Sequence, residues 1–127
     1  MLTESDIALL KGKEFAIIGT NSQEKGPQLT PVWIDTDGTN VIFNTSKGRV
    51  KHRNILADPN ITICIVDSAN PYHWISISGV AEMTEEGADA HIDFLAKKYL
   101  DQESYPYRGP GEVRVIVKVR PTSRASS

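Results

Sequence analysis

A dense group of cations follows a polar strand end near the middle of the chain. Residues 44–54 read NTSKGRVKHRN, so amide and hydroxyl side chains are followed by a glycine and by four cations. The cations are Lys47, Arg49, Lys51 and Arg53. A helix that begins in this run would add backbone N–H donors and the positive end of its dipole. With charge-assisted hydrogen bonds from Arg49 and Lys51 and a hydroxyl from Thr45 or Ser46, these groups would bind a phosphate.

The alternative interpretation of this run is that its cations form one solvated face of a helix. The run has no Walker spacing, and the glycines at 109 and 111 precede a strand instead of opening a helix, so no Rossmann fingerprint is present. The net charge of −2 does not favour a chain that binds nucleic acid over its whole surface. We therefore expect an anion site for a small molecule and no nucleic-acid partner.

Three aromatic residues are candidates for the wall of a ligand pocket. Trp33 lies two residues after Pro31 in one expected strand, and Tyr72 and Trp74 share a face of another. A flat heteroaromatic ring binds well between such side chains. The alternative is that they fill the core or form a subunit contact, which is compatible with a ring bound between two subunits.

The chain shows no catalytic machinery of its own. His52, His73 and His91 have no spacing suited to a shared metal, and neither a Ser-His-Asp set nor paired carboxylates can be identified. We expect His52 to face solvent or the anion. Cys64 is a single cysteine in an apolar run and is expected to be inert. A bound cofactor would therefore have to supply the chemistry.

The elements that must position these residues are mostly extended and closely spaced. A capping box at Thr3 and Asp6 predicts a first helix, a second is expected over 49–57, and Thr84 is expected to cap a third. Strands are expected at 15–19, 28–35, 41–46, 61–67, 72–82 and 112–120. Pro31 places its strand at an edge or a bulge. The pattern predicts one mainly β domain over 1–127, a small closed or half-closed barrel of about six antiparallel strands with two or three helices.

The last strand alternates strictly, which predicts inward Val113, Val115, Val117 and Val119 and outward Arg114, Ile116, Lys118 and Arg120. Pro121 is expected to end it, leaving 121–127 as a frayed tail. The N-terminus carries acids where a signal peptide needs positive charge, and no apolar run approaches the ~20 residues of a membrane span. We therefore expect a cytoplasmic protein without a membrane partner. Unpaired sheet edges make a homodimer plausible.

Four segments resemble, in order, the pyridoxamine 5'-phosphate oxidase-like split β-barrel family, and most closely its branch that uses the deazaflavin coenzyme F-420. They are PVWIDTDG, NTSKGRVKHRNILADPN, ISISGVAE and YPYRGPGEVRVIVKVRPT. The most specific piece has Thr45, Gly48, Arg49, Lys51 and Asn54 at family spacing. The resemblance implies an FMN-binding-like split β-barrel that forms a homodimer with cofactor sites at its interface.

The resemblance also assigns cofactor-binding residues. The phosphate would meet Ser46, Arg49, Lys51 and Asn54, with Asn44 and Thr45 close by. The ring would lie against the backbone of Thr30, Pro31, Val32 and Trp33. Tyr72 and Trp74 would wall the pocket, in one arrangement from the partner subunit.

The function implied is an oxidoreductase in which reduced coenzyme F-420 transfers a hydride to a small unsaturated substrate such as an enone or quinone. FMN is the alternative cofactor, because similar proteins bind either one in nearly the same groove. A non-catalytic flavin- or deazaflavin-binding module is the alternative from another class. A haem-handling barrel would need an exposed axial ligand, for which His73 is the candidate.

Overall fold

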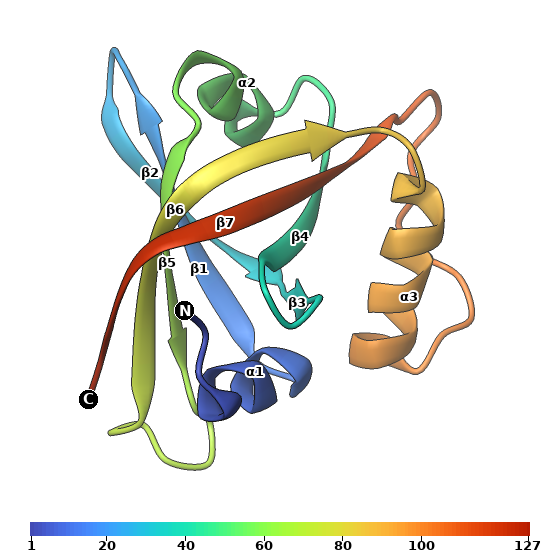
Figure 1. The fold of residues 1–127 in the computed structure, drawn as a ribbon. Coiled ribbons are helices and arrows are strands. Elements are labelled where there is room, and N and C mark those ends of the chain that lie inside the picture. Colours follow the sequence, from blue (N-terminus) through green and yellow to red (C-terminus); the bar gives the residue numbers. More distant parts are fainter.

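Every pair of neighbouring strands in the protein is antiparallel. The computed structural model describes residues 1–127, in which one seven-stranded sheet has the order β2-β1-β5-β6-β7-β4-β3 and curls into an open barrel (Figure 1). The strands are β1 (Phe15–Ser22), β2 (Gly26–Trp33), β3 (Asp35–Thr36), β4 (Val41–Ser46), β5 (Asn60–Val66), β6 (Trp74–Thr84) and β7 (Arg114–Ser126). The helices are α1 (Glu4–Lys11), α2 (Val50–Ala57) and α3 (Ala88–Leu100). The expected mainly β split barrel is confirmed.

The seventh strand arises because the chain bends after Trp33. The expected strand 28–35 ends there as β2, and Asp35 and Thr36 pair instead with Ile42 and Val41 of β4. Pro31 lies on β2, an edge strand of the sheet, as its missing N–H requires. The short connections between strands explain why antiparallel pairing was predictable from the sequence.

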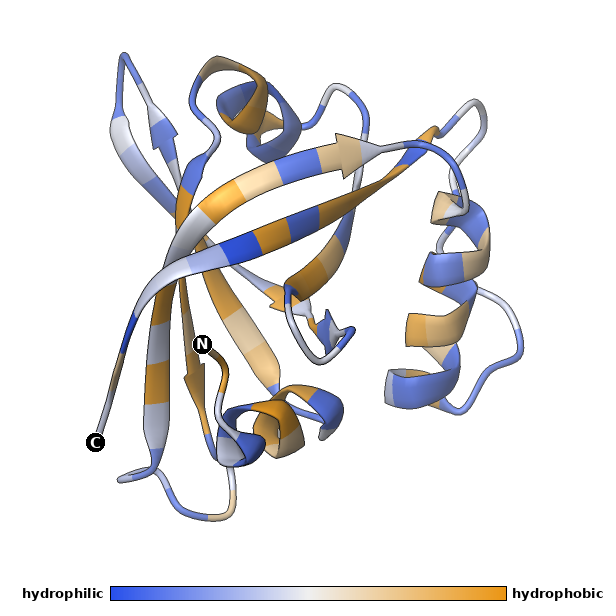
Figure 2. Cartoon of the chain, in the orientation of Figure 1, coloured by the Kyte–Doolittle hydropathy of each residue, from blue (hydrophilic) through white to orange (hydrophobic).

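The core fills the inside of the curled sheet. Alternate residues of β1, β5, β6 and β7 are buried, and apolar and polar colours alternate along β6 and β7 (Figure 2). The largest fully buried side chains include Phe43, Leu10, Ile18, Ile63 and Ile77. β4 is different, because all six of its residues are buried, the polar ones included. A polar strand end that is covered on both sides needs partners for its side chains.

The helix α1 lies below the barrel and contributes Leu9 and Leu10 to the core (Figure 1). Its predicted capping box is present: Asp6 N donates to Thr3 Oγ1 and Thr3 N donates to Asp6 Oδ2, both at 3.0 Å. None of the three helices is long and apolar enough to cross a membrane.

The prediction that Thr84 caps the third helix is wrong. Met83 and Thr84 still pair with β7, and Gly87, at φ 76°, turns the chain before α3 begins at Ala88. The core spacing predicted for this helix is confirmed, since its inward residues are buried. They are Ala88, Ile92, Leu95, Ala96 and Tyr99.

The expected frayed tail is also wrong, because β7 continues to Ser126. A register shift opposite Ser78 and Gly79 absorbs Pro121, and pairing resumes from Ser123 onward. A bulge is one of the few places where a sheet tolerates proline. Beyond it, the Arg124 guanidinium donates to both carboxylate oxygens of Asp6, each at 2.8 Å. This bidentate pair fastens the C-terminal strand to α1.

We predict that Arg124→Met lowers the free energy of unfolding by about 2 kcal/mol or more, because it leaves the buried Asp6 carboxylate without its charged partner. Urea unfolding followed by circular dichroism would measure the change. Arg120→Met is the matched control, since Arg120 is exposed on the same strand, and it should change stability by less than about 0.5 kcal/mol.

This difference between wild type and Arg124→Met should depend on pH. Burial alone would raise the pKa of Asp6, but hydrogen bonds from Arg124 and Thr3 outweigh it and hold the pKa below the usual 3.8. A lowered pKa contributes stability above the ordinary value, and that contribution is lost as the pH falls through the lowered one. A difference that stays constant below about pH 4 would contradict this account of the ion pair.

Candidate functional site

A groove of about 190 Å³ lies where β2, β4, α2 and α3 meet the loop of residues 101–113, called here the α3–β7 loop. Its lining combines a cationic end with aromatic and apolar walls. The lining residues are Pro31, Val32, Trp33, Asn44, Thr45, Arg49, Lys51, Ile92, Leu95, Tyr105, Tyr107 and Arg114. A more open hollow of about 420 Å³ adjoins it and shares Arg49 and Tyr107.

Most of the predicted binding residues meet at this groove. Seven of the twelve line it: Pro31, Val32, Trp33, Asn44, Thr45, Arg49 and Lys51. Ser46 lines the adjoining hollow, and Thr30 Oγ1 accepts a hydrogen bond from Lys51 Nζ at 2.7 Å. Asn54 does not line either space, because its amide donates to Thr20 Oγ1 at 3.1 Å.

Tyr72 and Trp74 do not line the groove of their own chain. Tyr72 lies in the turn before β6 and is 86% exposed, and Trp74 begins that strand. His73, between them, has Nδ1 3.1 Å from Asp67 Oδ2 and lines a separate hollow beside α1. Within one chain, these three residues therefore lie away from the groove.

Thr45 carries a buried hydroxyl without a hydrogen-bond partner. Its neighbours on β4 are saturated: Asn44 Nδ2 donates to Ala88 O at 3.0 Å, and Ser46 Oγ donates to Glu112. A buried hydroxyl left unpaired costs about 1–3 kcal/mol. Native proteins leave few such groups unpaired, and because Thr45 also lines the groove, its hydroxyl is a candidate for contact with a ligand.

The cations of the groove also keep donors free. The side chain of Arg49 is 59% exposed, and its nearest anion, Glu112 Oε1, is 3.8 Å from Nη2. Lys51 gives one bond to Thr30; burial, with a smaller effect from the charge of Arg49, lowers its pKa below the usual 10.5. No side chain caps the N-terminus of α2, which starts directly after Arg49. An anion bound here would meet two cations and a helix start.

The prediction that His52 faces solvent or the anion is wrong. His52 is 8% exposed, and its Nδ1 accepts a hydrogen bond from Gly48 N at 3.1 Å. The ring therefore fixes the turn in which Gly48 adopts φ 89°. From its buried position, His52 thus supports residues 47–53, which carry the four cations and are called here the basic turn.

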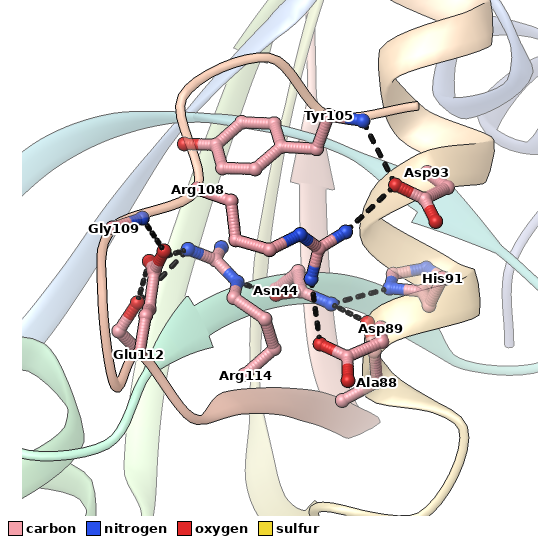
Figure 3. Close-up of polar contacts among 11 residues, drawn as sticks. Asn44, Ala88, Asp89, His91, Asp93, Tyr105, Arg108, Gly109, Glu112 and Arg114 are labelled. Carbon is pink, nitrogen blue, oxygen red and sulfur yellow. Dashed lines mark hydrogen bonds and ion pairs between the residues drawn. The ribbon is translucent and has the colours of Figure 1, made fainter. Parts of the chain in front are cut away.

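Arg114 is a site residue that the sequence analysis missed, since it was expected to point outward. It is 5% exposed, and its guanidinium donates from Nε to Asn44 Oδ1 at 2.8 Å and from Nη1 to Ser46 Oγ at 2.9 Å (Figure 3). Strand alternation gives the face of a residue but not what covers that face. Here the cover is the α3–β7 loop, whose Tyr105 ring lies 5.2 Å from the guanidinium carbon.

Glu112 was missed for the same reason, although its spacing of two residues from Arg114 places both on one face. Its Oε1 pairs with Arg114 Nη1, and its Oε2 accepts from Gly109 N at 2.9 Å. Burial would raise the pKa of Glu112, but hydrogen bonds from Ser46, Gly109 and Arg114 outweigh it and lower the pKa to about 2. The carboxyl is therefore ionised throughout the neutral range.

The α3–β7 loop is fixed over the groove by one arginine. Arg108 donates to Asp89 Oδ1 at 2.8 Å and to Asp93 Oδ1 at 2.9 Å, and Tyr105 N donates to the same Asp93 oxygen at 2.8 Å (Figure 3). The Tyr105 ring then meets Trp33 edge-on, with centroids 5.9 Å apart. The aromatic wall of the groove thus depends on charged contacts between this loop and α3.

Trp33 itself is backed by a second aromatic ring. It stacks on Tyr99 with centroids 5.3 Å apart, and Tyr99 packs with Ile92 and Leu95 in a small apolar cluster. No group of three or more His, Cys, Asp or Glu side chains is arranged to hold a metal ion. The groove can therefore hold a flat ring against Trp33 at one end and an anion at Arg49 and Lys51 at the other.

Comparison with known proteins agrees with this geometry. The sequence profile of the pyridoxamine 5'-phosphate oxidase family matches residues 2–123. A solved structure described as an F420 reductase superposes with a TM-score of 0.86 at 27% identity, covering 98% of each chain. No curated protein sequence matches the chain significantly.

Two further structures share the fold at lower identity. A conserved hypothetical protein from Mycobacterium tuberculosis has a TM-score of 0.77 at 21% identity, covering 99% of this chain and 84% of its own. A putative pyridoxamine 5'-phosphate oxidase from Listeria innocua has a TM-score of 0.74 at 16% identity, covering 97% and 95%. The profile match spans nearly the whole chain, and the chain therefore belongs to the pyridoxamine 5'-phosphate oxidase family, whose split β-barrels include flavin- and deazaflavin-binding oxidoreductases.

Proposed function

We propose that this protein is an oxidoreductase that binds coenzyme F-420 in the groove and reduces a small unsaturated substrate such as an enone or quinone. The bound reduced deazaflavin would supply the hydride. The observation that carries the proposal is the unpaired, buried Thr45 hydroxyl in a groove that also presents Arg49 and Lys51. Together these three residues offer a phosphate donors that the chain leaves unpaired.

The geometry favours three of the residues that were expected to bind the phosphate. Thr45, Arg49 and Lys51 have donors to give, whereas Asn44 and Ser46 are occupied by Arg114 and Glu112. We assign the first three to the phosphate and the other two to holding Arg114 behind it. Asn54 has no contact with the groove, and its role as a phosphate ligand is withdrawn.

The ring would lie against Thr30, Pro31, Val32 and Trp33. β2 is an edge strand, so one side of its backbone pairs with β1 and the other keeps unpaired peptide groups. A deazaflavin or flavin ring carries donors and acceptors along one edge, which such a strand can match. The chain's part in catalysis is to orient the ring and exclude water from it.

Coenzyme F-420 is preferred to FMN on two grounds. The F420 reductase likeness is at 27% identity over 98% of each chain. The groove also continues past Arg49 into the open hollow, whose lining includes Lys47, Gly109 and Glu112 and which offers room for the long tail that follows the phosphate of the deazaflavin. FMN, which ends at its phosphate, would leave that hollow unused.

A homodimer is supported by the outer face of the sheet. Large apolar side chains are exposed there on three neighbouring strands: Phe15 at 59%, Ile17 at 39%, Leu29 at 68% and Val66 at 45%. Exposed apolar groups gathered on one face mark an interaction surface. A second copy would cover them, and its Tyr72 and Trp74 would then complete the groove from across the interface, as expected from the family resemblance.

The function is tested by mixing the protein with reduced coenzyme F-420 and a panel of enones and quinones under anaerobic conditions. We predict consumption of the reduced cofactor, followed by its absorbance, with at least one substrate class, and micromolar binding of the oxidised cofactor by fluorescence quenching. Binding without consumption would favour the non-catalytic module. Micromolar binding of FMN with none of F-420 would overturn the choice of cofactor.

The anion site makes a separate prediction. Arg49→Ala with Lys51→Ala should weaken cofactor binding at least tenfold, because each removes a charge-assisted hydrogen bond to phosphate. Thr45→Val should weaken it several-fold and leave the fold at least as stable, because the lost hydroxyl has no partner in the free protein. Fluorescence titration and urea unfolding would measure the two effects.

Arg53→Ala is the matched control for this set, since Arg53 is an exposed cation of α2, close in sequence to Arg49 and Lys51, that does not line the groove. It should leave affinity within about twofold of wild type. Unchanged affinity in the Arg49/Lys51 double variant would return the basic turn to the solvated-face interpretation.

The homodimer predicts a particle of twice the 14.0 kDa chain mass in light scattering after size exclusion. Ile17→Lys should produce monomers, because it buries a charge in the apolar face, and should weaken cofactor binding in parallel. Thr39→Lys, on the exposed β3–β4 turn, should change neither property. A wild-type monomer that binds the cofactor with full affinity would contradict the shared site.

A further inference from the structure

One carboxylate lies inside the cationic end of the site. Glu112 Oε1 accepts from Ser46 Oγ, pairs with Arg114 Nη1 and lies 3.8 Å from Arg49 Nη2. Its other oxygen accepts from Gly109 N at 2.9 Å (Figure 3). An acidic side chain thus shares Arg49 with the phosphate that we assign to this site. The cations there are therefore only partly available to a ligand.

Glu112 is firmly placed in this position. Its side chain is 10% exposed and that of Arg114 is 4% exposed, so the pair is shielded from water. The hydrogen bonds that lower the pKa of Glu112 to about 2 keep it ionised at any pH used for binding. Arg108 fixes the same loop to α3. The negative charge of Glu112 is consequently a permanent feature of the site.

We propose that Glu112 makes the site select phosphate esters by charge, so that a singly charged phosphodiester is accepted and a doubly charged phosphomonoester is disfavoured. This inference rests on the proposed function and deepens it. Glu112 neutralises Arg114, which leaves Arg49 and Lys51 to face the ligand. A second negative charge on the phosphate would be repelled by the nearby carboxylate, and burial of that carboxylate strengthens the repulsion.

The position of Glu112 gives a second reason for the site to prefer a phosphodiester. It lines the open hollow that continues from the groove, together with Arg49 and Gly109. A phosphodiester would direct its second, uncharged ester bond into this hollow. A phosphomonoester would instead present a terminal oxygen there, facing the carboxylate. Coenzyme F-420 carries a phosphodiester and FMN a phosphomonoester, whose second pKa of about 6 makes it mainly dianionic at pH 8.

The experiment compares two ligands that share one ring: FMN and its methyl phosphodiester, riboflavin 5'-(methyl phosphate). Fluorescence titration at pH 8 gives the ratio of their dissociation constants. We expect wild type to prefer the methyl ester at least tenfold. This ratio needs no substitution, so it tests the proposal even if a variant does not fold.

Glu112→Gln should reduce the preference to less than about threefold, mainly by improving FMN binding. Glu112→Asp, which keeps the charge, should retain most of the preference. Glu24→Gln, in the exposed β1–β2 turn, makes the same change of net charge and should leave the ratio unchanged. Circular dichroism confirms that each variant is folded.

The outcomes separate this inference from the proposed function. If wild type binds neither coenzyme F-420 nor either flavin ester, the proposed function itself fails. If it binds both esters equally, or if folded Glu112→Gln keeps the wild-type ratio, the charge filter is wrong and the function stands. If wild type binds F-420 but neither ester, a gain of FMN binding in Glu112→Gln supports the filter and no gain contradicts it.

Discussion

The buried guanidinium of Arg114 is the group on which the rest of the site depends. A charge that is 5% exposed is tolerated only when its donors are paired. Arg114 meets that demand with Asn44 and Ser46 of β4 and with Glu112 of the α3–β7 loop. β4 and β7 pair directly, with Ser46 opposite Arg114, so the sheet register itself brings these groups together. The loop must then stay close enough for its carboxylate to complete the shell.

The same requirement reaches α3 through Asn44. Because Asn44 Oδ1 accepts from Arg114, its amide nitrogen must donate, and it does so to Ala88 O at 3.0 Å and to His91 Nδ1 at 3.1 Å. His91 therefore carries its proton on Nε2, which lies 3.2 Å from Asp35 Oδ2. The hydrogen bonds of Asn44 and the contact between His91 and Asp35 thus connect β3, α3, β4 and β7 into one rigid wall. Thr45 of β4, together with Arg49 and Lys51 beyond the end of that strand, keeps donors for a ligand, so the site combines fixed groups with available ones.

The parts of this arrangement that follow from local chemistry were predictable from the sequence. The basic turn, the edge position of Pro31 and the inward Val115, Val117 and Val119 follow from residue type and period alone. Val113, also predicted to point inward, is 40% exposed because β7 begins only at Arg114. The errors at Arg114 and at the end of β7 have a different cause, since both depend on contacts between distant segments. Arg114 looked exposed because alternation does not reveal the loop that covers it. The sequence predicted a frayed tail after Pro121. The bulge that tolerates this proline, opposite Gly79, arises only when β6 and β7 pair, so it cannot be seen in the sequence of β7.

Two ionisable groups next to the groove, Glu112 and Tyr99, are held away from neutral pKa values, which limits what they can do chemically. The pKa of Glu112 is lowered to about 2, and burial, helped by the charges of Glu14 and Asp35, raises the pKa of Tyr99 to about 12 despite a hydrogen bond with Ile34. Efficient general acids or bases have a pKa near the working pH. Neither group is therefore suited to transfer a proton: Glu112 stays ionised and Tyr99 stays neutral near pH 7. In the proposed reaction the chain positions ring and phosphate, and the proton that accompanies the hydride would come from solvent.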